Sequence, residues 1–414
     1  MGILGYEEVR RDKQLILKET MEGHILTESQ FSFFKELTLN LPGHGVTQML
    51  FSIGLVKTNS VVQSLIGVLF YYLPSLILIL ALSQLDVYFN RYYAKTIFSP
   101  SDDFLLFYMA VLIVGISQAV LGLLIHNSCH LFSDRATSLF NMSIMIISAL
   151  LNLMTDKFSS MVIIMILAGI FTMINGEKDN IFEDKQIDQI VPPTVTAEHS
   201  RFLGIPSFVT FLFFFICSAL TYEFLYYKSE TYPNLYLGST FFLIGTFTTT
   251  GGHSIIPLVL SSFGSKLGAL EILKGYAFVS ILPGPMFNLA AFIGGVMNGI
   301  LSGIISVIFI TLPGILLLMT FLANPNTLKY NSNLRNFLIG INLASIGFNF
   351  AAAYKLYKAV ALTNPYVDPI FSTFNIAICF LMLFSLNMAV PIVLLIGGAI
   401  IMFYSLVYLS LIHI

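Results

Sequence analysis

The chain has 414 residues, of which 56% are hydrophobic and only 10% are charged, and its formal net charge is −2. A soluble domain carries about 25% charged residues, so this composition indicates an integral, multi-pass membrane protein in a lipid bilayer, either the plasma membrane or an organelle membrane. No basic stripe is present, which argues against nucleic acid as a partner.

The start of the chain and its cysteines exclude two further classes. Residues 7–13 are mostly charged, and no apolar core precedes a cleavage site, so the N-terminus is not a secretory signal peptide. Cys129, Cys217 and Cys379 lie in apolar surroundings at unrelated spacings, which indicates neither a disulfide framework nor a zinc site. We expect neither a metal nor a cofactor.

Charge-free stretches long enough to cross a bilayer recur along the chain, because a crossing takes about 20 apolar residues. They are 37–56, 58–85, 104–133, 136–155, 158–176, 202–222, 231–265, 275–328, 336–354 and 369–414. We expect two spans within 275–328, separated by a turn at Gly299, and two within 369–414, separated near Asn387 and Pro391. The total is roughly eleven to twelve apolar segments, some of them re-entrant.

The only clear linker is the charged stretch 177–201, which follows a turn signal at Asn175-Gly176. Its composition differs sharply from its surroundings, so it divides the chain into two halves. We expect a first transmembrane repeat at 1–176, a linking transmembrane segment and loop at 202–235, and a second transmembrane repeat at 236–414.

Two Pro-Gly elements interrupt apolar runs at corresponding places in the halves. The first, LPGHGVTQ, begins at Leu41, and the second, LPGPMFN, begins at Leu282. Proline removes a backbone donor and glycine loosens a helix, so each element frees backbone polar groups that lipid cannot satisfy. Paired breaks in the two halves of a membrane chain indicate a transport site.

Two further blocks match in the same order: residues 72–78 with 311–317, and residues 115–122 with 340–347. They indicate an internal duplication. We therefore expect an all-α polytopic membrane protein with two homologous repeats, inverted relative to each other, whose helices are broken at the Pro-Gly elements. Nothing like residues 248–257 precedes the first Pro-Gly element, so we expect the opening half-span of the first repeat to be missing.

These elements resemble the chromate ion transporter family in its long, two-repeat form. The family repeat opens with a Phe-Gly-Gly segment, continues to a Pro-Gly-Pro element and ends in a helix containing Asn or Gln. Residues 251–253, 283–285 and 340–342 are similar to these elements, and the resemblance covers about residues 20–130 and 236–362. It implies transport of an oxyanion, with relatives tied to chromate and to sulfate as its mimic.

The chain departs from the family pattern at several positions. His44 stands where the family usually has its second Pro, so the first break is softer and gains a titratable ring. Thr250 replaces the Phe of the opening element, and Ser261 and Ser262 occupy a region where relatives often place an acidic residue. The resemblance therefore supports the fold more strongly than the substrate.

A tetrahedral dianion in a membrane needs positive potential and hydrogen-bond donors, and a helix N-terminus created by a break supplies both. The amides of Gln48 and Asn288 and the hydroxyls of Thr47, Thr249 and Thr250 add donors. The expected anion-binding residues are Pro42, Gly43, His44, Thr47, Gln48, Gly251, Gly252, His253, Pro283, Gly284, Pro285, Asn288 and Asn342. A structural alternative stays open for Gln48, Gln118, Asn288 and Asn342, which could instead form hydrogen bonds between helices.

Ionisable residues within spans are rare and mark candidate functional sites. His44 and His253 adjoin the breaks and could take part in anion binding or proton coupling. His126 and His130, with Cys129 between them, could face a metal, although an interfacial pair is the simpler interpretation. We interpret the rest as surface or interfacial residues: the Lys274–Glu271 pair, Lys355, Lys358 and Tyr72.

The expected function is secondary active transport of a small inorganic oxyanion of the chromate or sulfate type by alternating access. We expect no enzymatic activity, and a homodimer stays open. The alternatives are an anion channel on the same scaffold and an intramembrane metalloenzyme that uses His126, His130 and Cys129.

Overall fold

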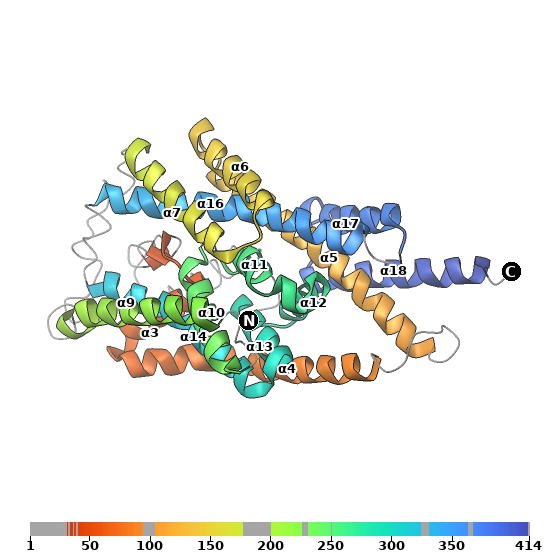
Figure 1. Cartoon of the computed structure of the whole chain (residues 1–414), viewed down its shortest axis with the longest axis horizontal. Coiled ribbons are helices and arrows are strands. Elements are labelled where there is room, and N and C mark those ends of the chain that lie inside the picture. Colours follow the sequence, from red (N-terminus) through yellow and green to blue (C-terminus); the bar gives the residue numbers. More distant parts are fainter. Residues whose placement is uncertain are drawn as a thin grey trace.

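The computed structural model describes residues 31–93 (except 32, 33, 36 and 39), 104–176, 200–225, 231–249, 251–323, 331–362 and 367–412. Every regular element in these ranges is a helix, which confirms the all-α prediction. Two long helices, α4 (Val61–Tyr93) and α16 (Ser332–Tyr357), run across the lower and upper parts of Figure 1, and the short helices α10 to α13 lie between them.

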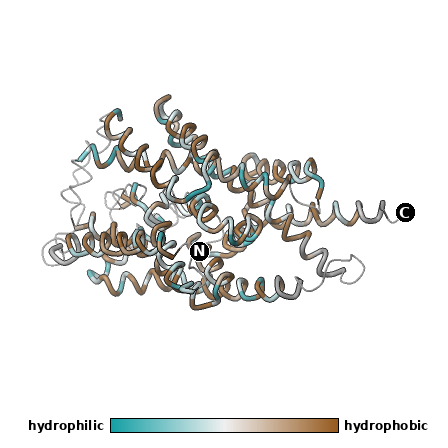
Figure 2. The backbone as a smooth tube through the Cα atoms, in the orientation of Figure 1, coloured by the Kyte–Doolittle hydropathy of each residue, from teal (hydrophilic) through white to brown (hydrophobic). Residues whose placement is uncertain are grey.

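Seven of the described helices are long and apolar enough to cross a membrane, and Figure 2 shows that hydrophobic residues predominate on most helices. Besides α4 and α16, these helices are α5 (Phe104–Arg135), α7 (Phe158–Asn175), α9 (Ser200–Leu225), α14 (Ile300–Ala323) and α18 (Val390–Ile412). Large apolar side chains such as Phe70 on α4 and Phe213 on α9 are exposed. Because such side chains are costly in water, these faces contact lipid, and the protein is an integral, multi-pass membrane protein.

Shorter helices occupy several of the predicted spans. The stretch 231–265 was expected to be one span, but it divides into α10 (Pro233–Phe247) and α11 (Ile255–Leu267), joined by the 3-10 turn η2 (Gly252–Ser254). The helix stops there because Gly251 has a φ of +106°, and the Ser254 hydroxyl donates to the carbonyls of Thr249 and Gly251. The expectation of a single span is therefore wrong.

The predicted divisions of the two longest stretches are confirmed. In the first, α12 (Ala269–Ile281) leads through the 3-10 turn η3 (Met286–Asn288) to α13 (Leu289–Asn298), and Gly299, with a φ of +87°, turns the chain into α14. In the second, α17 (Pro369–Phe384) and α18 are separated at Asn387, which has a φ of +48°.

The remaining helices are α3 (Gly45–Thr58), α6 (Leu139–Met154) and the π-helical turn η4 (Lys358–Leu362). Most of the expected linker, 177–199, lies outside the described residues.

The second pair of matched blocks forms α5 and α16, and their glycines show how the two halves interlock. A Cβ atom on Gly115 of α5 would lie 2.8 Å from the Gly397 oxygen of α18, and one on Gly122 would lie 3.0 Å from the Ile376 oxygen of α17. Helix α5 therefore packs closely against two helices near the C-terminal end of the chain, because a glycine lets two backbones approach.

Helix α16 makes the reciprocal contacts with helices of the first half. Gly340, which matches Gly115, packs against Ala168 and Thr172 of α7, and Gly347, which matches Gly122, packs against Met145 of α6. The helix from each matched block thus lies against the pair of helices that follows the other block. This exchange is what a twofold relation between two repeats produces.

Replacing Gly115 with alanine is expected to lower the thermal unfolding temperature, because the new methyl group meets backbone atoms of Gly397 and Gly398 that have no alternative rotamer. Overpacking of this kind costs about 1–3 kcal/mol, which exceeds the gain in helix propensity. Gly67→Ala on α4 is the matched control, since no atom lies within 4 Å of its added Cβ. A detergent thermal-shift assay showing equal effects of the two substitutions would contradict the close packing of α5.

Candidate functional site

Three helix breaks that are far apart in the sequence meet near the middle of the structure. We call them break 1 (residues 41–44), break 2 (residues 248–251, of which Thr250 lies outside the described residues) and break 3 (residues 282–285). The Gly43 backbone N–H in break 1 donates to the Thr248 carbonyl in break 2 at 2.7 Å. Just after break 2, a Cβ atom on Gly252 would lie 2.6 Å from the Met286 Cβ and 3.1 Å from the His44 ring. The Pro-Gly elements and the Gly-Gly segment therefore form one cluster.

Each break is followed at once by the N-terminus of a helix. Helix α3 begins after break 1, η2 and α11 begin after break 2, and η3 and α13 begin after break 3. The first N–H groups of a helix have no carbonyl partner within it, and the aligned peptide dipoles place partial positive charge at that end. The cluster therefore brings three helix N-termini together, next to the C-terminal ends of α10 and α12.

The amide of Gln48 holds break 1 against the second half of the chain. Its Nε2 donates to the carbonyl oxygen of Pro42 at 2.7 Å and to that of Gly314 on α14 at 3.0 Å. A Cβ atom on Gly43, which has a φ of +119°, would lie 2.9 Å from the Gly314 Cα. Break 1 therefore sits directly on α14, just after Pro313.

Asn288 holds break 3 against the first half in the matching way. Its Nδ2 donates to the Ser75 hydroxyl of α4 at 2.6 Å, and a Cβ atom on Gly284, which has a φ of +146°, would collide with Ser75. Ser75 follows Pro74 on α4 just as Gly314 follows Pro313 on α14. Each repeat thus contacts the break of the other repeat at equivalent positions, and we call these two contacts the latches.

The latches change the expected role of Gln48. Both of its amide N–H groups are donated to carbonyl oxygens, which can only accept, so neither remains for an anion. The alternative of bonding between helices is the one that this geometry supports. The sequence could not show this, because the acceptor at Gly314 lies 266 positions away. Gln118 forms bonds between helices as well, with Ser372 and Asn375 of α17.

Two hydroxyl networks extend from the histidines beside the breaks. His44 caps α3, and its Nδ1 lies 2.8 Å from the Thr47 hydroxyl, which in turn lies 3.0 Å from the Tyr72 hydroxyl. His253 lies 2.7 Å from the Tyr276 hydroxyl. Tyr72 is buried, so its assignment to an interfacial belt is wrong. Its position one turn before the latch residue Ser75 is the signal that could have identified it.

Asn342 is the expected site residue that lies farthest from the breaks in the sequence. It is buried on α16, and neither polar atom of its side chain has a hydrogen-bond partner in the described part of the chain. At 100° per residue, Asn342, Ser345 and Asn349 share the face of α16 opposite Gly340 and Gly347. Besides α6 and α7, helix α16 packs against α5, α11 and η2, the last two of which follow break 2.

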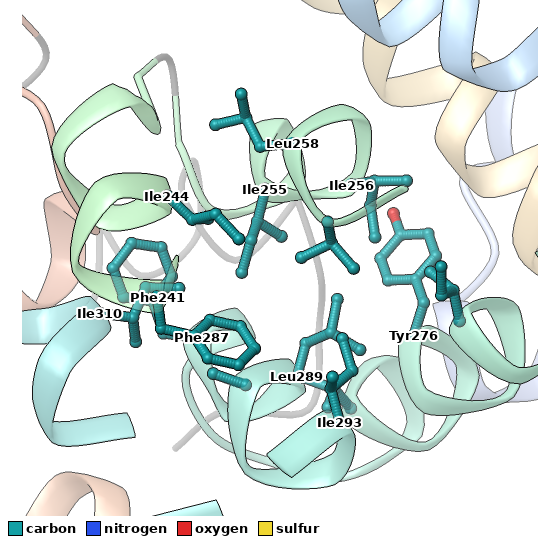
Figure 3. Packing of buried hydrophobic residues seen from close by; sticks show 14 of the residues in the cluster. Phe241, Ile244, Ile255, Ile256, Leu258, Tyr276, Phe287, Leu289, Ile293 and Ile310 are labelled. Carbon is teal, nitrogen blue, oxygen red and sulfur yellow. The ribbon is translucent and has the colours of Figure 1, made fainter. Parts of the chain in front are cut away.

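The breaks differ in how far they are covered. All four residues of break 1 are buried, whereas Pro283 in break 3 is exposed and Gly284 beside it is half-buried; Pro285 is buried. Gly251 and Gly252 are half-buried, and His253 is buried. Figure 3 shows Phe287 and Ile255, from the segments after breaks 3 and 2, packed with Phe241 of α10 and other apolar residues. This apolar packing fixes the positions of the short helices α11 and α13.

The other candidate groups lie elsewhere. His130 pairs with Asp134 at 3.2 Å, and both are exposed; the His126 ring contacts Phe380 and Phe384. Among the described residues, no three His, Cys, Asp or Glu side chains are grouped in a way that could hold a metal. Lys355 caps the end of α6 through the Asn152 and Thr155 carbonyls rather than only extending towards the membrane surface.

The expectation that Lys274 and Glu271 form a surface pair is wrong. Lys274 is buried and pairs with Asp86 of α4 at 2.7 Å as well as with Glu271 at 2.6 Å. The i,i+3 spacing of Glu271 and Lys274 fits an exposed pair as well as a buried one. Because Asp86 lies in the other half of the chain, sequence spacing could not reveal it as a second partner of Lys274.

Lipid-facing helices around a cluster of broken helices, with the two halves interlocked across it, define a helical membrane transporter. The model of the family described as "Chromate transporter" matches residues 14–173 and 235–403, and the chain belongs to this family. The two matched regions fit the two-repeat arrangement. Since members of this family are transporters, the metalloenzyme alternative is wrong.

A relative was found among curated proteins. The chain is 27% identical over 125 residues to an uncharacterized transporter of Methanocaldococcus jannaschii. This match covers 29% of the chain and 31% of the relative, so it spans about a third of that protein's length. No solved structure matches the chain.

Proposed function

We propose that this protein is a secondary active transporter of a small inorganic oxyanion of the chromate or sulfate type. The observation that carries the proposal is the meeting of three helix N-termini at the breaks. Each N-terminus acts as about half a positive charge, so three together offset most of the charge of a dianion. Membership in the chromate transporter family supports the same class of substrate.

The proposed anion contacts come from backbone groups and a few neutral side chains. Gly251, whose added Cβ would meet no atom within 4 Å, leaves its backbone open to a solute, and Pro285, directly before η3, leaves no buried donor unsatisfied there. Thr47, His44 and His253 supply polar groups beside the breaks, and Asn342 supplies an amide that no other described residue engages. Gln48 and Asn288 contribute by positioning the breaks through the latches.

The latches support a mechanism of alternating access. We propose that the repeats, 1–176 and 236–414 with a linking segment at 202–235, are inverted and move against each other. Each latch joins a break of one repeat to a helix of the other, so such a motion shifts both breaks together. Break 1 is covered while break 3 reaches the surface, and two equivalent halves of a carrier must differ in this way in any single state.

The direct test is transport by purified protein in proteoliposomes with radiolabelled sulfate and chromate. We expect saturable uptake and counterflow, in which unlabelled anion inside accelerates entry of label. A channel would conduct without counterflow. Failure of both anions to enter, with folded protein confirmed by size-exclusion chromatography, would remove the proposed substrate class.

Asn342→Ala is expected to raise the KM for the anion about tenfold, because one charge-assisted hydrogen bond contributes about 1.5–3 kcal/mol. The unfolding temperature should change little, since the side chain of Asn342 makes no hydrogen bond to the described residues. Asn141→Ala, at the start of α6, is the matched control. An unchanged KM in Asn342→Ala would exclude this residue from the site.

A further inference from the structure

A buried cluster of charges joins the two halves close to the proposed site. The Lys274 Nζ on α12 lies 2.7 Å from an Asp86 oxygen on α4 and 2.6 Å from a Glu271 oxygen. The Lys274 and Asp86 side chains are each 8% exposed, and the Glu271 side chain is 12% exposed. We call these three residues the triad.

The charges of the triad do not balance when all three groups are ionised. Two carboxylates and one ammonium together carry one net negative charge, and a net charge among largely buried side chains is costly. The carboxyl groups of Asp86 and Glu271 share the Lys274 ammonium, at 2.7 and 2.6 Å, so they are close neighbours and repel each other when both are ionised. Addition of one proton brings the net charge to zero.

The triad is placed to affect the anion. Helix α12 runs from Lys274 directly into break 3, and Asp86 lies eleven residues beyond the latch residue Ser75 on α4, about 16 Å along the helix at 1.5 Å per residue. With an effective dielectric constant of about 20, one negative charge at this distance weakens binding of a monoanion about sixfold and of a dianion about thirtyfold.

We propose that Asp86, Glu271 and Lys274 form a proton-binding site that couples anion transport to the proton gradient. A proton that binds one carboxylate removes the net negative charge, so the protonated protein binds the anion more tightly and the two are carried in the same direction. The inference rests on the proposed oxyanion function. It assigns the coupling to the triad rather than to the histidines beside the breaks.

No other titratable group in the described residues is equally well placed. Helices α13 and α14 and the turn η3, which pack against α4 or α12, carry no titratable side chain. Titratable groups on the other packed elements have other environments. Lys57 on α3 is exposed, and Lys266 on α11 lies over the Tyr236 ring. His253 on η2 contacts Tyr276, and Tyr404 on α18 stacks on Phe371. On α5, His130 pairs with Asp134, and His126 contacts phenylalanines of α17. Cys129 and Arg135 on α5 and Lys358 on η4 are further titratable groups on these elements.

The test compares wild-type protein with E271Q and D86N, each of which neutralises one carboxylate in nearly the same volume. D134N, in the exposed pair with His130, is the control. In proteoliposomes, we expect an acid-outside pH gradient to accelerate sulfate uptake by wild type and D134N at least fivefold. E271Q and D86N should keep sulfate counterflow but lose the acceleration.

Infrared spectra of the purified, full-length protein provide a readout that does not depend on transport. Wild type and D134N should show the C=O stretching band of a buried protonated carboxylic acid, and E271Q and D86N should lack it. Acceleration that persists in both triad variants, counterflow without any gradient effect in wild type, or acceleration by a sodium gradient instead would each overturn the inference. Absence of counterflow in wild type would instead remove the proposed function, while the infrared band would still report on the proton.

Discussion

Replacing Gly284 with alanine is expected to abolish transport and to destabilise the protein strongly. Gly284 has a φ of +146°, which residues with a Cβ rarely adopt, at a cost of about 1–3 kcal/mol. The added Cβ would also lie 2.5 Å from the Ser75 Cβ and closer still to its hydroxyl. This overpacking adds about 1–3 kcal/mol and separates break 3 from α4.

Two controls separate the cost of the positive φ at Gly284 from the cost of the collision with Ser75. Gly299 also has a positive φ, +87°, but no atom lies within 4 Å of its added Cβ, so Gly299→Ala should show the backbone cost alone and retain most transport. In the double variant of Gly284→Ala with Ser75→Gly, the close contact is removed and the unfolding temperature should partly recover. A double-mutant cycle in which the two changes are additive would show that Gly284 and Ser75 do not act together.

Gln48→Leu is expected to have the second largest effect. The substitution keeps the size of the buried side chain but removes the amide that donates to the Pro42 and Gly314 carbonyls. Each unsatisfied buried group costs about 1–3 kcal/mol, so the unfolding temperature and the turnover rate should both fall, the latter at least tenfold.

The Gln48→Leu result also decides whether the Gln48 amide positions break 1 or contacts the anion directly. If Gln48 acts through the latch, the variant loses stability and kcat, while the KM of the remaining active protein changes little. A raised KM at unchanged stability would instead support direct contact with the anion. Gln63→Leu, on the exposed face of α4, makes the same chemical change away from the breaks and should leave both quantities unchanged.

The sequence was informative wherever the relevant signal is local. The Pro-Gly elements, the turn at Gly299 and the charge-free stretches each depend on residues within a few positions, and the structure has breaks, a turn and helices there. The matched blocks also led to the right helices, because Gly115 and Gly122 of α5 have the same packing task as Gly340 and Gly347 of α16.

The sequence was uninformative where a residue depends on a distant partner. The role of Gln48 depends on the Gly314 carbonyl, and the burial of Lys274 depends on Asp86, and neither pairing leaves a trace in local spacing. The stretch 231–265 was misread for a related reason. Its hydrophobicity is that of one span, but its backbone bonds are completed by the Ser254 hydroxyl and by Gly43 of break 1.

The exchange of helices between the halves has a consequence for biogenesis. Among the described residues, the side chain of Gln118 on α5 has its hydrogen-bond partners on α17, some 250 residues later, at 3.0 Å from the Ser372 hydroxyl and from the Asn375 amide nitrogen. When α5 leaves the ribosome and enters the bilayer, its amide and its glycine face therefore have no partner. Final packing must wait until α17 has been translated, and a nascent chain that stops before α17 presents an unsatisfied amide to the membrane's quality-control machinery.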